Sequence, residues 1–185
     1  MTFFLALIAG FALGLFAVWV WHLNFGFRSQ RAGDYAHLGP DFDLRRLFDG
    51  TIQCDGVIYG PAGQVVSRFM ARMICTWDGN IGHIDEVFHY DGGEVQHRSW
   101  DVTLQPDGTM TATAPDILGI AWGQQSGSAM CLRYRLQLPE DSGGHVLRAT
   151  DWMYLLENGV IVNRSQFRKF GVKVAELVAT MRKVP

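Results

Sequence analysis

Lysine and cysteine are both scarce in this sequence. Only three of the 185 residues are lysines, and the formal net charge is −2 at pH 7. Nucleic-acid-binding domains concentrate basic residues on one face, so this composition argues against a nucleic-acid partner. The three cysteines, Cys54, Cys75 and Cys131, are widely spaced and form no Cys-x-x-Cys pair. We expect them to be core residues in a reducing compartment. The alternative is a disulfide between two of them, if the domain lies outside the cytoplasm.

The sequence also lacks recognisable catalytic and phosphate-binding motifs. The sequence has no Gly-x-Ser-x-Gly segment and no glycine-rich loop placed after a strand as a phosphate cradle. Three histidines, His83, His89 and His97, lie close together, but the alternation of the chain puts them on an outward face and too far apart for one metal ion. We therefore expect no cofactor and no metal, and an enzyme is the least favoured class.

The longest apolar run extends from Phe3 to Trp21 and contains no charged residue. At about 1.5 Å per residue, such a run spans most of the hydrocarbon layer of a bilayer. It ends in tryptophans, which suit the membrane interface. A cleaved signal peptide has basic residues before its apolar run, and here none precedes the run. The run predicts a retained single-pass membrane helix, with a cleaved signal and a buried helix as alternatives.

The basic residues nearest to this run follow it, beginning with Arg28 and Arg31. This asymmetry favours a cytoplasmic location for the rest of the chain, with a periplasmic location as the alternative. We predict an anchor at residues 1–22, a linker at 23–41 and one folded domain at 42–185. The expected location is therefore a membrane that the apolar run crosses once.

Short alternating segments joined by turn signals make up the folded domain. Residues 65–77 alternate between apolar and polar, and Asp78-Gly79 then indicates a hairpin. A two-residue loop there pairs Met73 with Ile84. The next turn, Asp91-Gly92-Gly93, suits a three-residue loop, which puts Glu86 opposite Arg98.

The turn pattern predicts eight to ten consecutive antiparallel strands with one inward face. Such a meander avoids exposed edges by closing into an up-and-down, lipocalin-like barrel; a two-sheet sandwich is the alternative. The final segment has apolar residues at Val174, Leu177, Val178 and Met181, with the spacing of a helix. We therefore expect a mainly β fold that ends in an amphipathic helix.

Several segments resemble a known family in their order and spacing. They are FDLRRLFDG (42–50), TWDG (76–79), DWMYL (151–155), NRS (163–165) and KFG (169–171). The chain resembles the bacterial domain-of-unknown-function family number 3833. Many members look like lipoproteins, and some are encoded near enzymes resembling cyclopropane-fatty-acid synthases, which implies an envelope location and a connection to lipids. Together with the apolar run, the resemblance implies the inner (plasma) membrane of a bacterium as the location. This chain has no cysteine at the end of its apolar run and so departs from the lipoprotein pattern.

Two charged pairs are candidates for ligand contact. Glu86 and Arg98 fall opposite one another on the inward face, where charges are costly unless paired. If Asn158-Gly159 is a two-residue loop, Asp151 and Arg164 also share a face. A structural role for each pair is the alternative. The predicted ligand-binding residues are Glu86, Arg98, Trp100, Met73, Ile84, Asp151, Arg164 and Tyr154.

Three functions remain open from the sequence. The first is a membrane-tethered barrel that binds a hydrophobic small molecule such as a fatty acyl group or a lipid, and it requires a cavity of at least about 300 Å³. The second is an accessory or assembly subunit of a membrane protein complex, with a filled interior. The third is an enzyme that uses Glu86 or Asp151 as a general acid or base.

Overall fold

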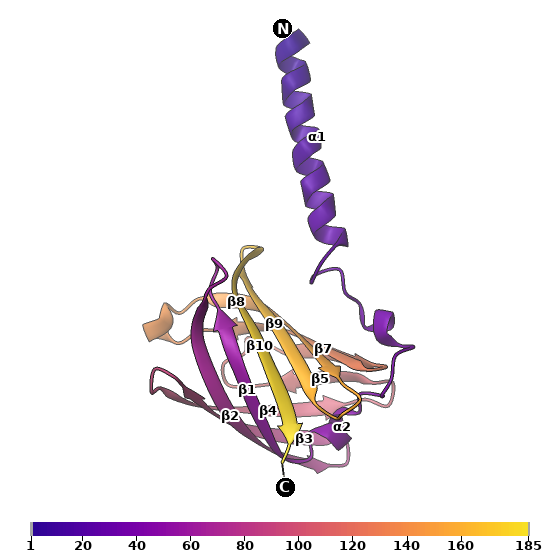
Figure 1. The fold of residues 1–185 in the computed structure, drawn as a ribbon, viewed down its shortest axis with the longest axis vertical. Helices are drawn as coiled ribbons and strands as arrows, with labels where there is room; N and C mark the ends of the chain where they lie inside the picture. Colours follow the sequence, from indigo (N-terminus) through magenta and orange to yellow (C-terminus); the bar gives the residue numbers. More distant parts are fainter. Residues whose placement is uncertain (1, 185) are drawn as a thin grey trace.

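The computed structural model describes residues 2–184 as a closed antiparallel barrel with a long helix rising from one end (Figure 1). Each of the ten strands pairs with its neighbours in the sequence, and β1 pairs with β10 to close the barrel. The predicted up-and-down barrel is therefore confirmed. The strands are β1 (Gly50–Tyr59), β2 (Val65–Asp78), β3 (Ile81–Tyr90), β4 (Val95–Leu104), β5 (Thr109–Thr113), β6 (Ala121–Ser126), β7 (Ala129–Gln137), β8 (Val146–Leu155), β9 (Ile161–Lys169) and β10 (Val172–Lys183).

The apolar run forms α1 (Thr2–Asn24), and its stretch Phe3–Trp21 has a mean hydropathy of 2.5 with no part of it buried. The helix is long and apolar enough to cross a membrane, and a signal sequence would share these properties. Because it projects away from the barrel (Figure 1), the buried-helix alternative is wrong. The remaining helical turns are short: η1 (Ala32–Tyr35), α2 (Leu44–Leu47) and η2 (Glu140–Ser142).

The predicted C-terminal helix is wrong, because β10 occupies this segment. The apolar residues there fit a period of two as well as a helical period, and Ala179 and Met181 both point into the core. As a strand, the segment pairs with β9 along one edge and with β1 along the other. A helix would leave those two edges unpaired, which explains why barrel closure overrides the helical spacing.

The registers of two hairpins differ from the prediction in different ways. Between β2 and β3 the loop is one residue further along the chain, so Met73 faces Glu86 instead of Ile84. This changes the pairing by two residues and leaves the inward face unchanged. Between β3 and β4 the predicted pairing of Glu86 with Arg98 is confirmed.

The β8–β9 hairpin has a three-residue loop rather than the predicted two-residue loop. The Gly159 N–H donates to the Leu156 carbonyl, and Gly159 has a φ of +80°. The pairing therefore moves by one residue, so Asp151 faces Ser165 and Trp152 faces Arg164. A shift by one exchanges the two faces of a strand, and Arg164 consequently lies outside the barrel.

The two ends of the barrel differ. At one end Phe42, Leu44 and Phe48 are buried, and the Trp77 Nε1–H donates to the Phe48 carbonyl at 2.6 Å. At the opposite end the side chains that line the interior remain partly exposed. These are Phe88, Phe167 and Leu177.

Much of the predicted linker packs on the outer wall of the barrel, and we call residues 27–42 the strap. Phe27 and Tyr35 pack against Trp152, whose side chain is completely buried. The hydroxyls of Tyr35 and Tyr154 both donate to Gln30 Oε1, and the Phe42 N–H donates to the Gly127 carbonyl at 2.7 Å. The strap therefore holds the barrel in a defined position relative to the end of α1.

Candidate functional site

A polar cluster lies in the middle of the otherwise apolar barrel interior. Glu86 comes from β3 and Arg98 from the facing position on β4. Asp151 comes from β8 on the other side of the barrel, and the Tyr134 hydroxyl of β7 donates to Asp151 Oδ2 at 2.8 Å. All four side chains line one cavity.

Arg98 has a partner that the strand pattern did not reveal. Its Nε lies 2.8 Å from Asp116 Oδ2, in the connection between β5 and β6, whereas its Nη1 lies 4.0 Å from Glu86 Oε2. The guanidinium also lies over the Trp100 ring, 4.3 Å from its centroid, a favourable cation–π contact. Arg98 is therefore held mainly by Asp116 and Trp100, and Glu86 is its more distant partner.

Buried polar atoms in this cluster are without partners. Glu86 Oε2, Arg98 Nη2 and Asp151 Oδ1 make no hydrogen bond within the described part of the chain. Most buried polar atoms in folded proteins are hydrogen-bonded, and leaving one without a partner costs about 1–3 kcal/mol. Three such atoms around one cavity are positions at which a water molecule or a ligand would form hydrogen bonds.

The cavity is smaller than expected. Its volume is about 130 Å³, below the roughly 300 Å³ that marks the lower end of ligand pockets. The cavity that the sequence-based hypothesis of acyl-chain or lipid binding required is therefore not present among the residues that the structure describes. The lining side chains include Glu86, Arg98, Tyr134, Asp151, Asn163 and Ser165, together with apolar ones such as Phe69, Met73, Ile84, Trp100, Met110, Ala112 and Phe167.

The sequence profile of "Protein of unknown function (DUF3833)" matches residues 21–183, which include the strap and all ten strands of the barrel. The chain belongs to the DUF3833 family. The predicted resemblance to family 3833 is thus confirmed. No curated protein matches this DUF3833 chain at a significant level.

Among solved structures, the DUF3833 barrel is similar to an S-type phycobiliprotein lyase, CPES, from Guillardia theta. The TM-score is 0.57 with 10% sequence identity, and the match covers 84% of this chain and 98% of that chain. At this identity the similarity shows the fold alone. It supports the lipocalin-like character predicted for the barrel.

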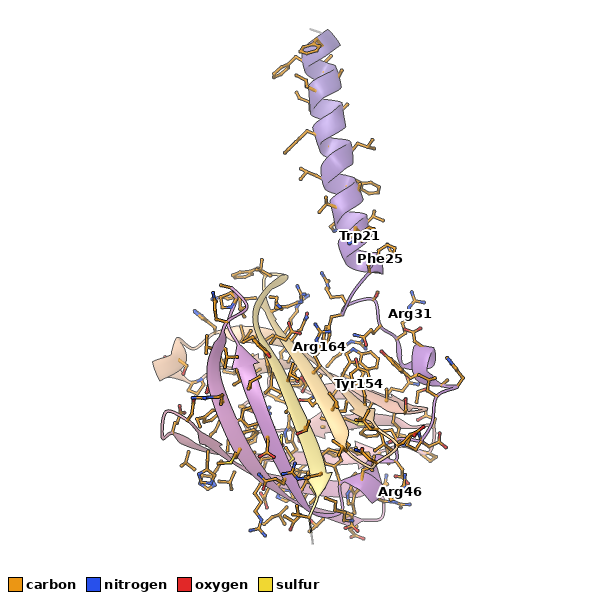
Figure 2. The ribbon with its side chains drawn as sticks, in the orientation of Figure 1. Trp21, Phe25, Arg31, Arg46, Tyr154 and Arg164 are labelled. Atoms are coloured by element: carbon orange, nitrogen blue, oxygen red, sulfur yellow. The ribbon has the colours of Figure 1, made fainter. Side chains whose placement is uncertain are left out.

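Six of the eight predicted ligand-binding residues line the cavity of this DUF3833 protein. They are Glu86, Arg98, Trp100, Met73, Ile84 and Asp151. Their contact with a ligand remains a prediction. The other two lie outside the barrel beside the strap (Figure 2): Tyr154 hydrogen-bonds to Gln30, and Arg164 pairs with Glu176 and lies over the Phe27 ring. The assignment of Arg164 to the interior depended on the incorrect β8–β9 loop length, whereas Tyr154 alternates with Asp151 along β8 and faces outward in either register.

Sequence reasoning missed Tyr134 and three further polar residues at the site. Asn163 and Ser165 line the cavity because the β8–β9 register differs by one residue. The third, Asp116, lies in the connection between β5 and β6, where side chains do not alternate between an inward and an outward face as they do in a strand. A usable signal existed for the first two, since Gly159 at the third position of a three-residue hairpin loop is a common arrangement.

Burial alters the acidity of the carboxyl groups in the DUF3833 cavity. Burial raises the pKa of Glu86 from its ordinary 4.5 to about 7, against the opposing effect of Arg98. Burial also raises the pKa of Asp151, although hydrogen bonds from Ser165 and Tyr134 oppose the shift. The interior therefore holds protons on carboxyl groups at pH values where exposed carboxyl groups are ionised.

The Glu86 shift predicts a pH dependence of stability. Above pH 4.5 the unfolded chain releases this proton while the folded chain keeps it, so the stabilising contribution is complete below pH 4.5. It is lost as the pH rises to about 7, the pKa of the folded state. We expect a loss of about 3 kcal/mol over this interval, to be measured by urea unfolding of the wild-type chain against Glu86→Gln. Parallel pH curves for the two proteins would contradict the prediction.

Proposed function

We propose that this protein is a membrane-tethered binding module that takes the polar end of a small amphipathic molecule into its barrel. The observation that carries the proposal is the set of unpartnered atoms Glu86 Oε2, Arg98 Nη2 and Asp151 Oδ1 around one cavity. A ligand group that both donates and accepts hydrogen bonds would satisfy them. The helix α1 supplies the tether, and the basic residues that follow it favour the cytoplasmic side of a bacterial inner membrane.

The charges in the cavity favour an uncharged polar group over a carboxylate. Three carboxyl groups, those of Glu86, Asp116 and Asp151, surround one guanidinium, and Arg98 is already 2.8 Å from Asp116. A ligand carboxylate would therefore find the positive charge already offset by Asp116, and it would lie beside two carboxyl groups whose ionisation burial already disfavours. A hydroxyl or amide group would pair with Arg98 Nη2 and with the raised-pKa carboxyl groups without adding charge.

The cavity volume sets where the apolar part of the ligand lies. About 130 Å³ holds a polar group and a short apolar stretch, comparable to a cavity of about 150 Å³ that binds benzene. A longer apolar part would extend past Phe88 and Phe167 toward the partly exposed end of the barrel. A lipid fits this proposal with its polar group inside and its chain near the barrel mouth.

We expect Ala112→Trp to abolish ligand binding. Ala112 is buried and lines the cavity, so an indole there would fill the space at a stability loss of about 1–3 kcal/mol. The full chain purified from its own membranes and analysed by native mass spectrometry should carry a stoichiometric small molecule that Ala112→Trp lacks. The neighbouring outward residue Thr113 provides the matched control, because Thr113→Trp should retain the ligand.

The accessory-subunit function is the second candidate, and the small cavity volume favours it. A barrel of this kind with a filled interior would act through its outer surface. In the same measurement, a co-purifying protein without any small molecule would support this function and contradict the binding proposal.

A further inference from the structure

The turn between β9 and β10 has an unusual residue at its tip. Phe170 is 95% exposed and has a φ of +51°, and Gly171 follows with a φ of +84°. Two consecutive positive φ values define a tight hairpin turn whose first position strongly favours asparagine, aspartate or glycine. A bulky aromatic residue is rare in this conformation. Neither its exposure nor its backbone conformation benefits the fold, which suggests that Phe170 acts on something outside the chain.

The surroundings of Phe170 are apolar and positively charged. Val172 is exposed on the same hairpin, as is Val66 at the start of β2 next to the neighbouring turn. Four basic residues, Arg164, Arg168, Lys169 and Lys173, lie on the β9–β10 hairpin, and Glu176 is the acidic residue paired with two of them. An exposed aromatic tip with basic flanks has the chemistry of a segment that enters the interface of an anionic bilayer.

The end of α1 lies close to this hairpin. The pKa of Arg168 is lowered, mainly by burial and also by the positive charge of Arg28. Arg28, four residues after the end of α1, therefore lies near Arg168 on β9. Figure 1 shows the β9–β10 turn at the end of the barrel from which α1 rises, and Figure 2 shows Trp21 and Phe25 at the height of this end. Trp21 stacks on Phe25 with centroids 4.4 Å apart, and both are exposed. Aromatic residues at the end of a membrane helix mark the interface, so the hairpin tip lies at that level.

We propose that the β9–β10 hairpin inserts Phe170 into the interface of the bilayer that α1 enters, so that the partly exposed end of the barrel rests on an anionic membrane. The inference rests on the proposed membrane tether and not on the ligand. Phe167 and Leu177, which line this end of the cavity, belong to the same two strands as the inserted tip. An amphipathic molecule would then pass between the bilayer and the cavity without crossing water.

The test measures the depth of fluorescent labels attached to single introduced cysteines in the full chain. The native Cys54, Cys75 and Cys131 are buried, and burial raises their pKa values to about 12, 12 and 11, so they react slowly with thiol reagents. The chain is reconstituted in nanodiscs of anionic phospholipid containing lipids spin-labelled near the headgroup. The labelled variants are Phe170→Cys, Asn158→Cys at the opposite end of the barrel, and Leu13→Cys within α1.

Headgroup-level spin labels should quench the label at position 170 and leave the label at position 158 bright. Equal quenching at positions 170 and 158 would overturn the inference. The label at position 13 reports the tether separately, through lipids spin-labelled at the acyl terminus. If position 13 is quenched and position 170 is not, the docking fails while the tether stands; if neither is quenched, both fail.

A second variant separates insertion from folding. Phe170→Asn places a favoured residue in the turn, so the melting temperature in detergent should stay the same or rise. A label at Val172→Cys should nevertheless lose most of its headgroup-level quenching in this variant. Unchanged quenching would show that Phe170 does not anchor the hairpin and would overturn the proposal.

Discussion

Replacement of Arg98 by methionine is expected to lower the free energy of unfolding by about 3–5 kcal/mol, the usual result of removing one member of a buried charge pair. The substitution would remove the guanidinium whose Nε lies 2.8 Å from Asp116 Oδ2, so the Asp116 carboxylate would lose its partner. It would also remove the cation–π contact with Trp100. Methionine keeps an unbranched apolar stem but lacks the guanidinium, so the loss combines the missing charge with the space that the guanidinium leaves beside Trp100. Equilibrium urea unfolding of the full chain in mild detergent at pH 7 measures it.

Two further variants make this prediction specific. Arg182 pairs with Asp55 at 3.1 Å on the surface, where both side chains are partly exposed, so Arg182→Met should change stability by less than about 1 kcal/mol. Adding Asp116→Leu to Arg98→Met removes the stranded carboxylate and should recover part of the loss. If Arg98→Met is no more destabilising than Arg182→Met, the buried pair does not exist as described.

Gly127→Ala is expected to detach the strap from the barrel. A Cβ atom at Gly127 would lie 1.8 Å from the Tyr35 carbonyl oxygen and 2.8 Å from the Leu38 carbonyl oxygen. These are backbone atoms, so no side-chain rotation relieves the overlap. The strap must move away, and the hydrogen bond from the Phe42 N–H to the Gly127 carbonyl is lost with it.

The detached strap has two measurable consequences. Trp152, completely buried beneath the strap, should become exposed and shift its fluorescence to longer wavelength. Trypsin should also cut after Arg28 and Arg31 faster than in the wild-type chain, because unfolded segments are the preferred sites of proteolysis.

The matched control is Gly79→Ala. Gly79 has a φ of +60°, close to the +50° of Gly127, but no described atom lies within 4 Å of the added Cβ position. This variant shares the backbone strain of alanine at positive φ, about 1–2 kcal/mol, without the overlap. Equal trypsin sensitivity in the two variants would show that the effect arises from strain and not from the strap contact.

Local chemistry in the sequence was sufficient for the meander of hairpins and for its apolar inward face, although not for the last strand, β10. Glycines at the ends of turns, as in Asp91-Gly92-Gly93, specify hairpins because they supply positive φ, and consecutive hairpins with one apolar face lead to a closed meander. The Glu86–Arg98 pairing followed from one such loop length. Even the error at Asp78-Gly79 left the inward face intact, since it moved the register by two residues.

The candidate site was less accessible to this reasoning, because its members come from unrelated parts of the chain. Asp116 reaches Arg98 from a connection without alternation. A single extra residue in the β8–β9 loop moved Arg164 outside the barrel and brought Asn163 and Ser165 inside. Errors of one residue are invisible in composition yet exchange the faces of a whole strand.

By itself, the sequence determined the apolar helix, the consecutive order of the hairpins up to residue 170 and the inward position of the Glu86–Arg98 pair, because these depend on short-range turn geometry and alternation. Only the tertiary structure decided that residues 172–183 form a strand, that the strap covers Trp152 and that the cavity measures about 130 Å³. Each of these depends on contacts between residues distant in the sequence. The unpaired edges of β1 and β9, the apolar outer surface around Trp152 and the packing of side chains in the interior arise only when the barrel forms. Short-range patterns in the sequence therefore do not reveal them.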